Sequence, residues 1–142
     1  MKAELMHATE VLLGGECSGE TLVLEEPLSF WGGLDPESGR IVDEHHPQRG
    51  ECVARRILVM PGTRGSTSSP GALADALQLG NGPAAVILAA PNVTILVAAM
   101  IARELYDTVL PVLVVDPADY RRLRSGRLLT IAEGSVRVAN NV

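Results

Sequence analysis

The chain has 142 residues, 12 of them basic and 17 acidic, so its net charge is −5 and we expect one domain over residues 1–142. This acidic balance argues against nucleic acid or an anionic membrane as the main partner. Apolar residues make up 46% of the sequence and aromatic residues only 3%, so the expected core is aliphatic.

The two cysteines, Cys17 and Cys52, have a spacing that fits no metal-ligand pattern. The N-terminus carries Glu4, His7 and Glu10 where a signal peptide would need an apolar segment. We therefore expect a cytoplasmic protein with two partly buried, free thiols and no metal bound by this chain.

In the N-terminal half, we expect the first fifteen residues to fray and the first strand to lie over Glu20–Glu25. A long segment rich in Gly, Pro, Asp and Ser follows, Pro27–Glu51. It holds a turn signal at Asp35–Gly39 and a short candidate strand at Arg40–Val42. A loop of this length inside a compact domain is usually functional.

Strands and helices alternate over the second half of the chain. Strands are expected at Val53–Met60, Ala84–Ala89 and Val109–Val115, helices at Pro70–Leu79, Val93–Tyr106 and from Pro117, and a final hairpin at Arg127–Val138. We expect Ser69, or Ser68 in its place, to cap the first of the three helices, and Asn92 and Asp116 to cap the other two. This order predicts an α/β domain with a mixed sheet and flanking helices.

The uncharged run from Pro83 to Ala102 is long enough to suggest a transmembrane helix. However, Pro91–Asn92 interrupts the run, and Asn92 is a suitable helix N-cap. We therefore expect a buried strand, a turn and a buried helix instead.

A hydroxyl-rich loop, PGTRGSTSSPG at residues 61–71, joins an expected strand to an expected helix. The N–H groups and the dipole at a helix N-terminus favour an anion. Gly62 and Gly65 allow the backbone to approach a ligand closely, and Arg64 can hold a carboxylate or phosphate through two hydrogen bonds. Ser66 and Thr67 are not needed for capping, and a serine alkoxide here could accept a proton from carbon.

The loop matches neither G-x-S-x-G, the nucleophile elbow, nor a phosphate-binding loop ending in G-K-[ST]. Its local sequence leaves three interpretations open. These are a plain serine-rich turn, an anion site without catalysis, and a catalytic loop.

A longer pattern favours the catalytic interpretation. LEEPLSFWGGLDPESGRIVDEHHPQRGE (residues 24–51), followed by ILVMPGTRGSTSSPGAL (residues 57–73), resembles the small, swivel-type subunit of aconitase X. The downstream segments PAAVIL and ELYDTVLPVLVV fit the same pattern, so the resemblance covers about Gly15 to Val138.

This resemblance implies a hydro-lyase made of a large catalytic part and a small swivelling part, fused or as two chains. It implies that this chain is the small part, a swivelling β/β/α domain whose loops close over the active site. The family is known to act on cis-3-hydroxy-L-proline and on mevalonate 5-phosphate, which are both small hydroxy-carboxylates.

The resemblance also implies roles for the hydroxyl loop. Ser66 matches the serine that abstracts the substrate proton in aconitase-like enzymes. Aconitases proper have an arginine two positions later to hold the substrate carboxylate, and Ser68 stands there in this chain. We expect Arg64 to take over part of that role, with Gly65, Thr67 and Ser68 also contacting substrate.

The family's iron–sulfur cluster is held by the large subunit, so we expect this chain to supply no cluster ligand and to be inactive alone. Its Arg-rich composition, with Lys2 as the only lysine, favours a bacterial cis-3-hydroxy-L-proline dehydratase. The alternatives are the small subunit of a mevalonate 5-phosphate dehydratase and a non-catalytic swivel module that binds an anion or a protein.

Two further features of the long loop are left open by the sequence. Phe30 and Trp31 could pack against the domain or contact a partner or the active site. His45–His46, beside Asp43 and Glu44, have metal-ligating side chains, but adjacent residues rarely converge on one ion. For the histidines we favour a role in positioning the loop or in a subunit interface.

Overall fold

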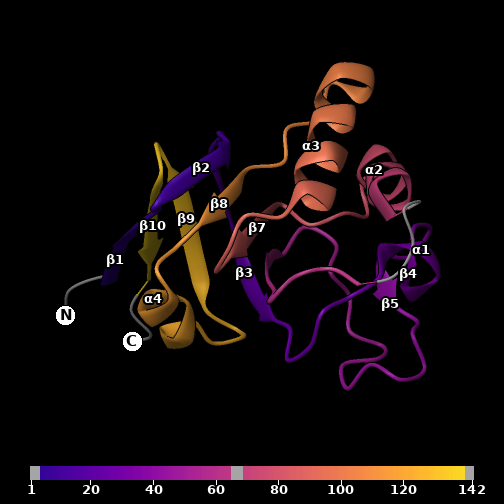
Figure 1. Cartoon of the computed structure of the whole chain (residues 1–142), viewed down its shortest axis with the longest axis horizontal. Coiled ribbons are helices and arrows are strands. Elements are labelled where there is room, and N and C mark those ends of the chain that lie inside the picture. The colour runs from indigo at the N-terminus through magenta and orange to yellow at the C-terminus, as the bar shows by residue number, and fades with distance from the viewer. Residues whose placement is uncertain (1–3, 65–68, 140–142) are drawn as a thin grey trace.

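The computed structural model describes residues 4–64 and 69–139, which form the helices and strands labelled in Figure 1. The strands are β1 (Glu4–His7), β2 (Glu10–Leu13), β3 (Cys17–Val23), β4 (Leu34–Asp35), β5 (Arg40–Ile41), β6 (Ile57–Val59), β7 (Ala85–Leu88), β8 (Val112–Val114), β9 (Leu128–Ala132) and β10 (Ser135–Val138). The helices are α1 (Phe30–Gly33), α2 (Ser69–Gln78), α3 (Val93–Tyr106) and α4 (Pro117–Arg122).

Eight of these strands form one mixed sheet in the order β1-β10-β9-β3-β6-β7-β8-β2. The pairs β3–β6, β6–β7 and β7–β8 are parallel and the others are antiparallel. Strands β1 and β2 are consecutive in the chain but lie at opposite ends of this order. The N–H of Ala8 donates to the Gly134 carbonyl and that of Thr9 to the Val114 carbonyl, both at 2.8 Å, so the sheet curls until its edges meet.

The central strands are buried on both faces, which explains their unbroken apolar sequences. Along β6, Ile57 and Val59 point into the curl of the sheet, while Leu58 between them faces the helices. Helices α1, α2 and α3 cover that outer face, as Figure 1 shows at its right. The inside of the curl is filled mainly by aliphatic side chains from β1, β6, β7, β9 and β10, and Leu123, just after α4, adds to it.

The chain's first strands correct the expectation that residues 1–15 fray. Strand β1 pairs with β10 and β2 pairs with β8, and Met6 and Leu13 are buried in the two cores. These strands are hard to predict from local sequence because each is short and pairs with a strand about a hundred residues away or more.

Most other expected elements are confirmed. The predicted bounds of α3 are those observed, and the expected final hairpin is formed by β9 and β10, which turn at Glu133–Gly134. The expected strand at Val53–Met60 is wrong in its first half, because Arg55 adopts a positive φ of 60° and breaks the extended chain before β6. The α/β fold with a mixed sheet and flanking helices is confirmed.

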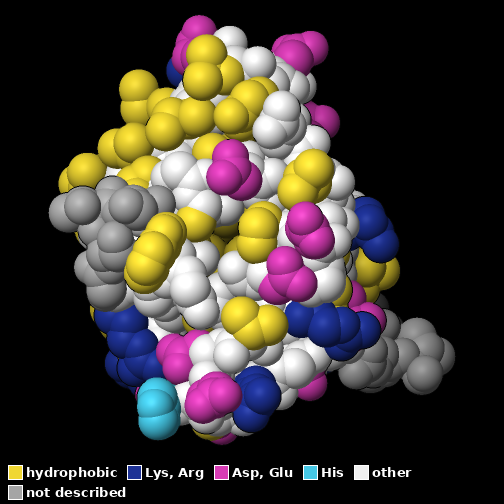
Figure 2. All heavy atoms as spheres, turned by 90° about the vertical axis from the view of Figure 1, so that its right-hand side faces the viewer, with side chains coloured by type: hydrophobic (Ala, Val, Ile, Leu, Met, Phe, Trp, Pro, Cys, Tyr) yellow, Lys and Arg dark blue, Asp and Glu magenta, His cyan; other side chains and the backbone are white. Residues whose placement is uncertain are grey.

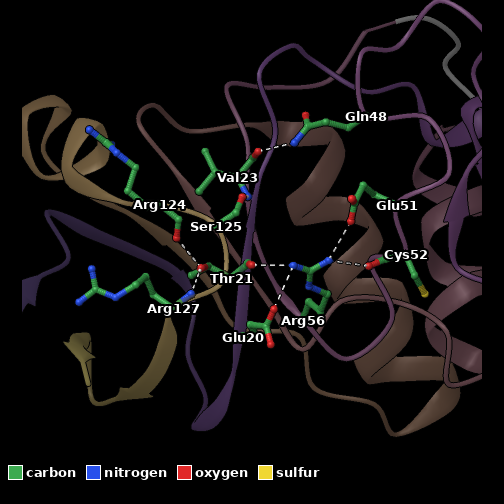
Figure 3. A network of polar contacts seen from close by, with 10 residues as sticks. All are labelled: Glu20, Thr21, Val23, Gln48, Glu51, Cys52, Arg56, Arg124, Ser125 and Arg127. Carbon is green, nitrogen blue, oxygen red and sulfur yellow. Dashed lines mark hydrogen bonds and ion pairs between the residues drawn. The ribbon is translucent and has the colours of Figure 1, made fainter. Parts of the chain in front are cut away.

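A polar network fastens the long loop to the strand junction between β3 and β6 (Figure 3). The Arg56 guanidinium donates to the Thr21 carbonyl at 2.9 Å and to the Cys52 carbonyl at 3.4 Å. It also pairs with Glu20 and Glu51. These contacts hold the end of the long loop against the sheet on the side where the parallel strands begin.

The expected strand, turn and helix over Pro83–Ala102 are confirmed as β7 and α3. Within the described residues, the helices are too short or too polar to cross a bilayer.

Candidate functional site

Three loops meet beyond the carboxyl ends of the neighbouring parallel strands β3, β6 and β7. They begin at Leu24, Met60 and Ala89, respectively. In α/β sheets, ligands bind preferentially in the crevice outside the carboxyl ends of the strands. This edge therefore forms the candidate site, and the hydroxyl loop belongs to it.

The first two loops are joined through their backbones. Leu28 and Thr63 form an isolated parallel bridge. The Leu28 N–H donates to the Gly62 carbonyl and the Arg64 N–H to the Leu28 carbonyl, both at 3.3 Å. Gly62 has a φ of 154°, which residues with a side chain rarely adopt, so glycine is needed where the loop turns.

Asn92 joins the third loop to the second. Its Oδ1 accepts the Ile95 N–H at 3.0 Å, which caps α3 as the sequence predicted. Its Nδ2 donates to the Thr63 hydroxyl at 3.2 Å. One side chain thus both starts the helix and holds the hydroxyl loop.

Arg64 is held by two carboxylates. Its guanidinium contacts Glu26 and Asp43, each at 3.3 Å, while remaining 40% exposed. The His45 N–H donates to Asp43 and is the main cause lowering the pKa of that carboxyl; partial burial opposes the shift and Arg64 adds to it. A substrate anion that Arg64 bound would compete with these two carboxylates.

His46 is buried, and both of its ring nitrogens make hydrogen bonds to backbone groups. Its Nδ1 accepts the Gln48 N–H at 3.1 Å, so the ring proton is on Nε2, which donates to the Glu26 carbonyl at 3.2 Å. His45 is exposed. Positioning of the long loop, the role favoured from the sequence, is therefore consistent with the contacts of His46. The hydrogen bond from His46 to the Glu26 carbonyl was not predicted from the sequence.

The two aromatic residues have different environments. Phe30 is fully buried in the core, whereas Trp31 is 60% exposed. The Trp31 N–H lies 3.5 Å from the Ser69 hydroxyl, and its carbonyl accepts the Ser29 hydroxyl at 2.8 Å. Trp31 forms one wall of a cavity of about 520 Å³ that Asp75 of α2 also lines. The segment that carries Phe30 and Trp31, here called the aromatic loop, is therefore packed against the start of α2.

The prediction that Ser69 caps α2 is wrong, because Ser69 is already the first residue of the helix. Its buried hydroxyl accepts the Trp31 N–H instead. Gly65, Ser66, Thr67 and Ser68 lie outside the described residues. The chain on either side of them is fixed, by the bridge between Leu28 and Thr63 before the gap and by α2 after it.

In residues 4–64 and 69–139, no three His, Cys, Asp or Glu side chains are arranged to bind a metal ion. Cys17 and Cys52 are partly buried free thiols, as expected. Burial raises the pKa of the Cys17 thiol, and the Cys52 thiol lies 3.5 Å from the Ser38 carbonyl.

Comparison with known protein families identifies the fold. Residues 6–139 match the family described as the aconitase X swivel domain. The chain belongs to this family. A crystal structure of Thermococcus kodakaraensis aconitase X in its holo-form superposes with a TM-score of 0.83 at 29% identity, covering 96% of this chain and 99% of that one. The swivel-domain fold is therefore confirmed.

Two kinds of relative resemble this swivel domain. The cis-3-hydroxy-L-proline dehydratase of Pseudomonas aeruginosa is 38% identical over 112 residues, which are 79% of this chain and 19% of the relative. That of Hypocrea jecorina is 34% identical over 86% of this chain and 20% of the relative. The chain thus spans about a fifth of the length of these enzymes. The phosphomevalonate dehydratase small subunit of Thermococcus onnurineus is 31% identical over 89% of this chain and 93% of that subunit.

Proposed function

We propose that this chain is the small subunit of a two-chain aconitase X hydro-lyase that dehydrates cis-3-hydroxy-L-proline. The observation that carries the proposal is the match of nearly the whole swivel domain to dehydratases that are about five times longer, or that are themselves small subunits. The domain accounts for one part of such an enzyme, so we infer a large-subunit partner and no activity of this chain alone.

In the proposed mechanism, Ser66 is the general base. It removes the proton from the carbon that bears the carboxylate, the hydroxyl leaves the adjacent carbon, and a double bond forms as water is lost. Arg64 and the loop residues Gly65, Thr67 and Ser68 bind the substrate carboxylate. An iron–sulfur cluster bound by the large subunit would supply a Lewis acid for the leaving hydroxyl.

The charges around the site support hydroxyproline over a phosphorylated substrate. Segments 24–28, 43–46 and 61–64 carry four carboxylates, Glu25, Glu26, Asp43 and Glu44, and one arginine. That arginine is already paired with two of the carboxylates. A phosphate monoester would be repelled here, whereas the ring ammonium of hydroxyproline is compatible with surplus negative charge. The alternative, a mevalonate 5-phosphate dehydratase, requires the large subunit to supply the cations.

The test is an anaerobic purification of the tagged chain from its own host, followed by assays of bound iron and of both substrates. We expect a stoichiometric larger partner that carries iron, and a complex that dehydrates cis-3-hydroxy-L-proline. A complex that acts only on mevalonate 5-phosphate would support the alternative substrate. A chain that never binds a larger partner would favour the non-catalytic swivel module.

A further inference from the structure

Helix α3 is apolar on its outer side as well as on its core side. Eleven of its fourteen residues are apolar. Ile95, Ala98, Ala99 and Ala102 are fully buried and pack into the core. A helix that is apolar on all sides is normally covered on all sides, so its exposed side calls for a partner.

We define the outer α3 face as the five apolar residues on the side away from the core. They are Val93, Val97, Met100, Ile101 and Leu105. Val93, Val97, Ile101 and Leu105 follow one another at intervals of four residues. Met100 lies three residues after Val97, so all five lie along one side of the helix. Val93 is 74% exposed and Leu105 70% exposed, and the last four residues line a shallow groove together with Glu104.

Figure 2 shows hydrophobic side chains gathered at the top of the molecule, over α3. Exposed, contiguous apolar patches of this kind mark interaction sites. The charged residues at the end of the helix, Arg103 and Glu104, pair with each other at 3.5 Å. The face therefore carries little net charge, which suits an apolar partner surface.

The outer α3 face begins at the candidate site. Its first residue, Val93, directly follows Asn92, whose side chain holds Thr63 of the hydroxyl loop. A partner that completes the active site at this loop must come close to Asn92. The outer α3 face is an apolar surface that starts next to this point, at Val93.

We propose that the outer α3 face docks against the large subunit of the dehydratase, an inference that rests on the proposed function. In the cis-3-hydroxy-L-proline dehydratases, about four-fifths of the polypeptide lies outside the region that this chain matches. That remainder is the body against which a swivel domain must pack. The face is mainly apolar, Glu104 beside it is paired with Arg103, and it is adjacent to the site, as such a contact requires.

The test compares the double variant Val97→Lys/Met100→Lys with a matched control, Leu128→Lys. Leu128 lies on β9 and is a similarly exposed apolar residue, at 54% against 45% for Met100. The binding partner is the polypeptide from the same organism that matches the remaining four-fifths of the Pseudomonas aeruginosa enzyme. Affinity is measured by calorimetry, and folding by circular dichroism and thermal unfolding.

We expect the unmodified chain and Leu128→Lys to bind equally, and the double variant to bind about 100-fold more weakly or worse, because two charges must lose water against an apolar surface. All three should unfold at similar temperatures, since the changed side chains are exposed. Equal binding by all three would overturn the proposal, as would failure of the unmodified chain to bind. Self-association of the chain alone that the double variant abolishes would also overturn it, in favour of a second copy on this face.

These outcomes separate this inference from the proposed function. A complex that needs the outer α3 face but dehydrates neither substrate would uphold the docking surface and contradict the proposed reaction. A complex that is active and that still forms with the double variant would uphold the proposed reaction and contradict the docking surface.

Discussion

Arg64 shows how individual side chains hold the loops of the candidate site together. It lies on the loop after β6, and its guanidinium reaches Glu26 on the loop after β3 and Asp43 on the loop after β5. Exposed ion pairs contribute little to stability one by one. Their effect here is to fix the direction in which the hydroxyl loop leaves the sheet.

The first prediction concerns the titration of Asp43. Arg64→Gln should raise the pKa of Asp43, but not fully to its ordinary value of 3.8, because the larger cause, the His45 N–H, remains. The carboxyl titration measured by NMR checks this, with Arg103→Gln on α3 as the control. An Asp43 titration that Arg64→Gln leaves unchanged would show that the ion pair is not formed.

The same pKa shift has a consequence for stability. Because folding lowers the pKa of Asp43, its carboxylate stabilises the fold above about pH 4, and this contribution is lost as pH falls through the lower, folded-state value. Arg64→Gln should therefore cost stability at neutral pH and progressively less below pH 4. Urea unfolding at several pH values measures the difference.

At the scale of elements, Asn92 links α3 to the hydroxyl loop, and its two roles can be separated. Asn92→Ala removes the cap of α3 and the bond to Thr63, so we expect a loss of about 1–2 kcal/mol in the free energy of unfolding. Thr63→Val removes only the second bond and should cost less. Chemical denaturation of both variants tests this; equal losses would mean that the cap contributes nothing.

The elements differ in how far the sequence could predict them. Asn92 and Asp116 cap their helices through neighbouring N–H groups, so local sequence was sufficient to identify them. Ser69 had the same local signal, yet its hydroxyl meets Trp31, thirty-eight residues away. Local sequence could not anticipate that contact, because it depends on how the aromatic loop packs against α2.

At the scale of the molecule, β1 is the edge strand beside β10, and its continuation through Ala8 and Thr9 into β2 joins the two edges of the sheet. Met6 of β1 is buried inside the curl, whereas its neighbour Leu5 is half exposed. Met6→Ala should therefore lower the free energy of unfolding by about 2–5 kcal/mol, and Leu5→Ala by much less. Denaturant unfolding measures both, and equally small effects would contradict a role for β1 in the core.

The candidate site was predictable only in part, for a related reason. The hydroxyl loop is one continuous segment with a recognisable pattern, so the sequence identified it directly. Its supports are Glu26 after β3, Asp43 after β5 and Asn92 after β7. Glu26 and Asn92 come close to the loop because β3, β6 and β7 are adjacent and parallel. The only sign of these supports in the sequence is a carboxylate or amide residue shortly after a strand. Placing them beside the hydroxyl loop requires the order of the strands in the sheet.

We propose that Ser66 removes the substrate proton. The most direct measurement is the kcat of the assembled, iron-loaded complex carrying Ser66→Ala, compared with Ser18→Ala, which removes an exposed hydroxyl on β3 that contacts only Thr130 among the hydrogen bonds described. We predict that Ser66→Ala lowers kcat on cis-3-hydroxy-L-proline by about 10²–10⁴-fold with the complex intact, and that Ser18→Ala leaves it unchanged. A Ser66→Ala complex that turns over at a rate close to that of the unmodified enzyme would contradict the account.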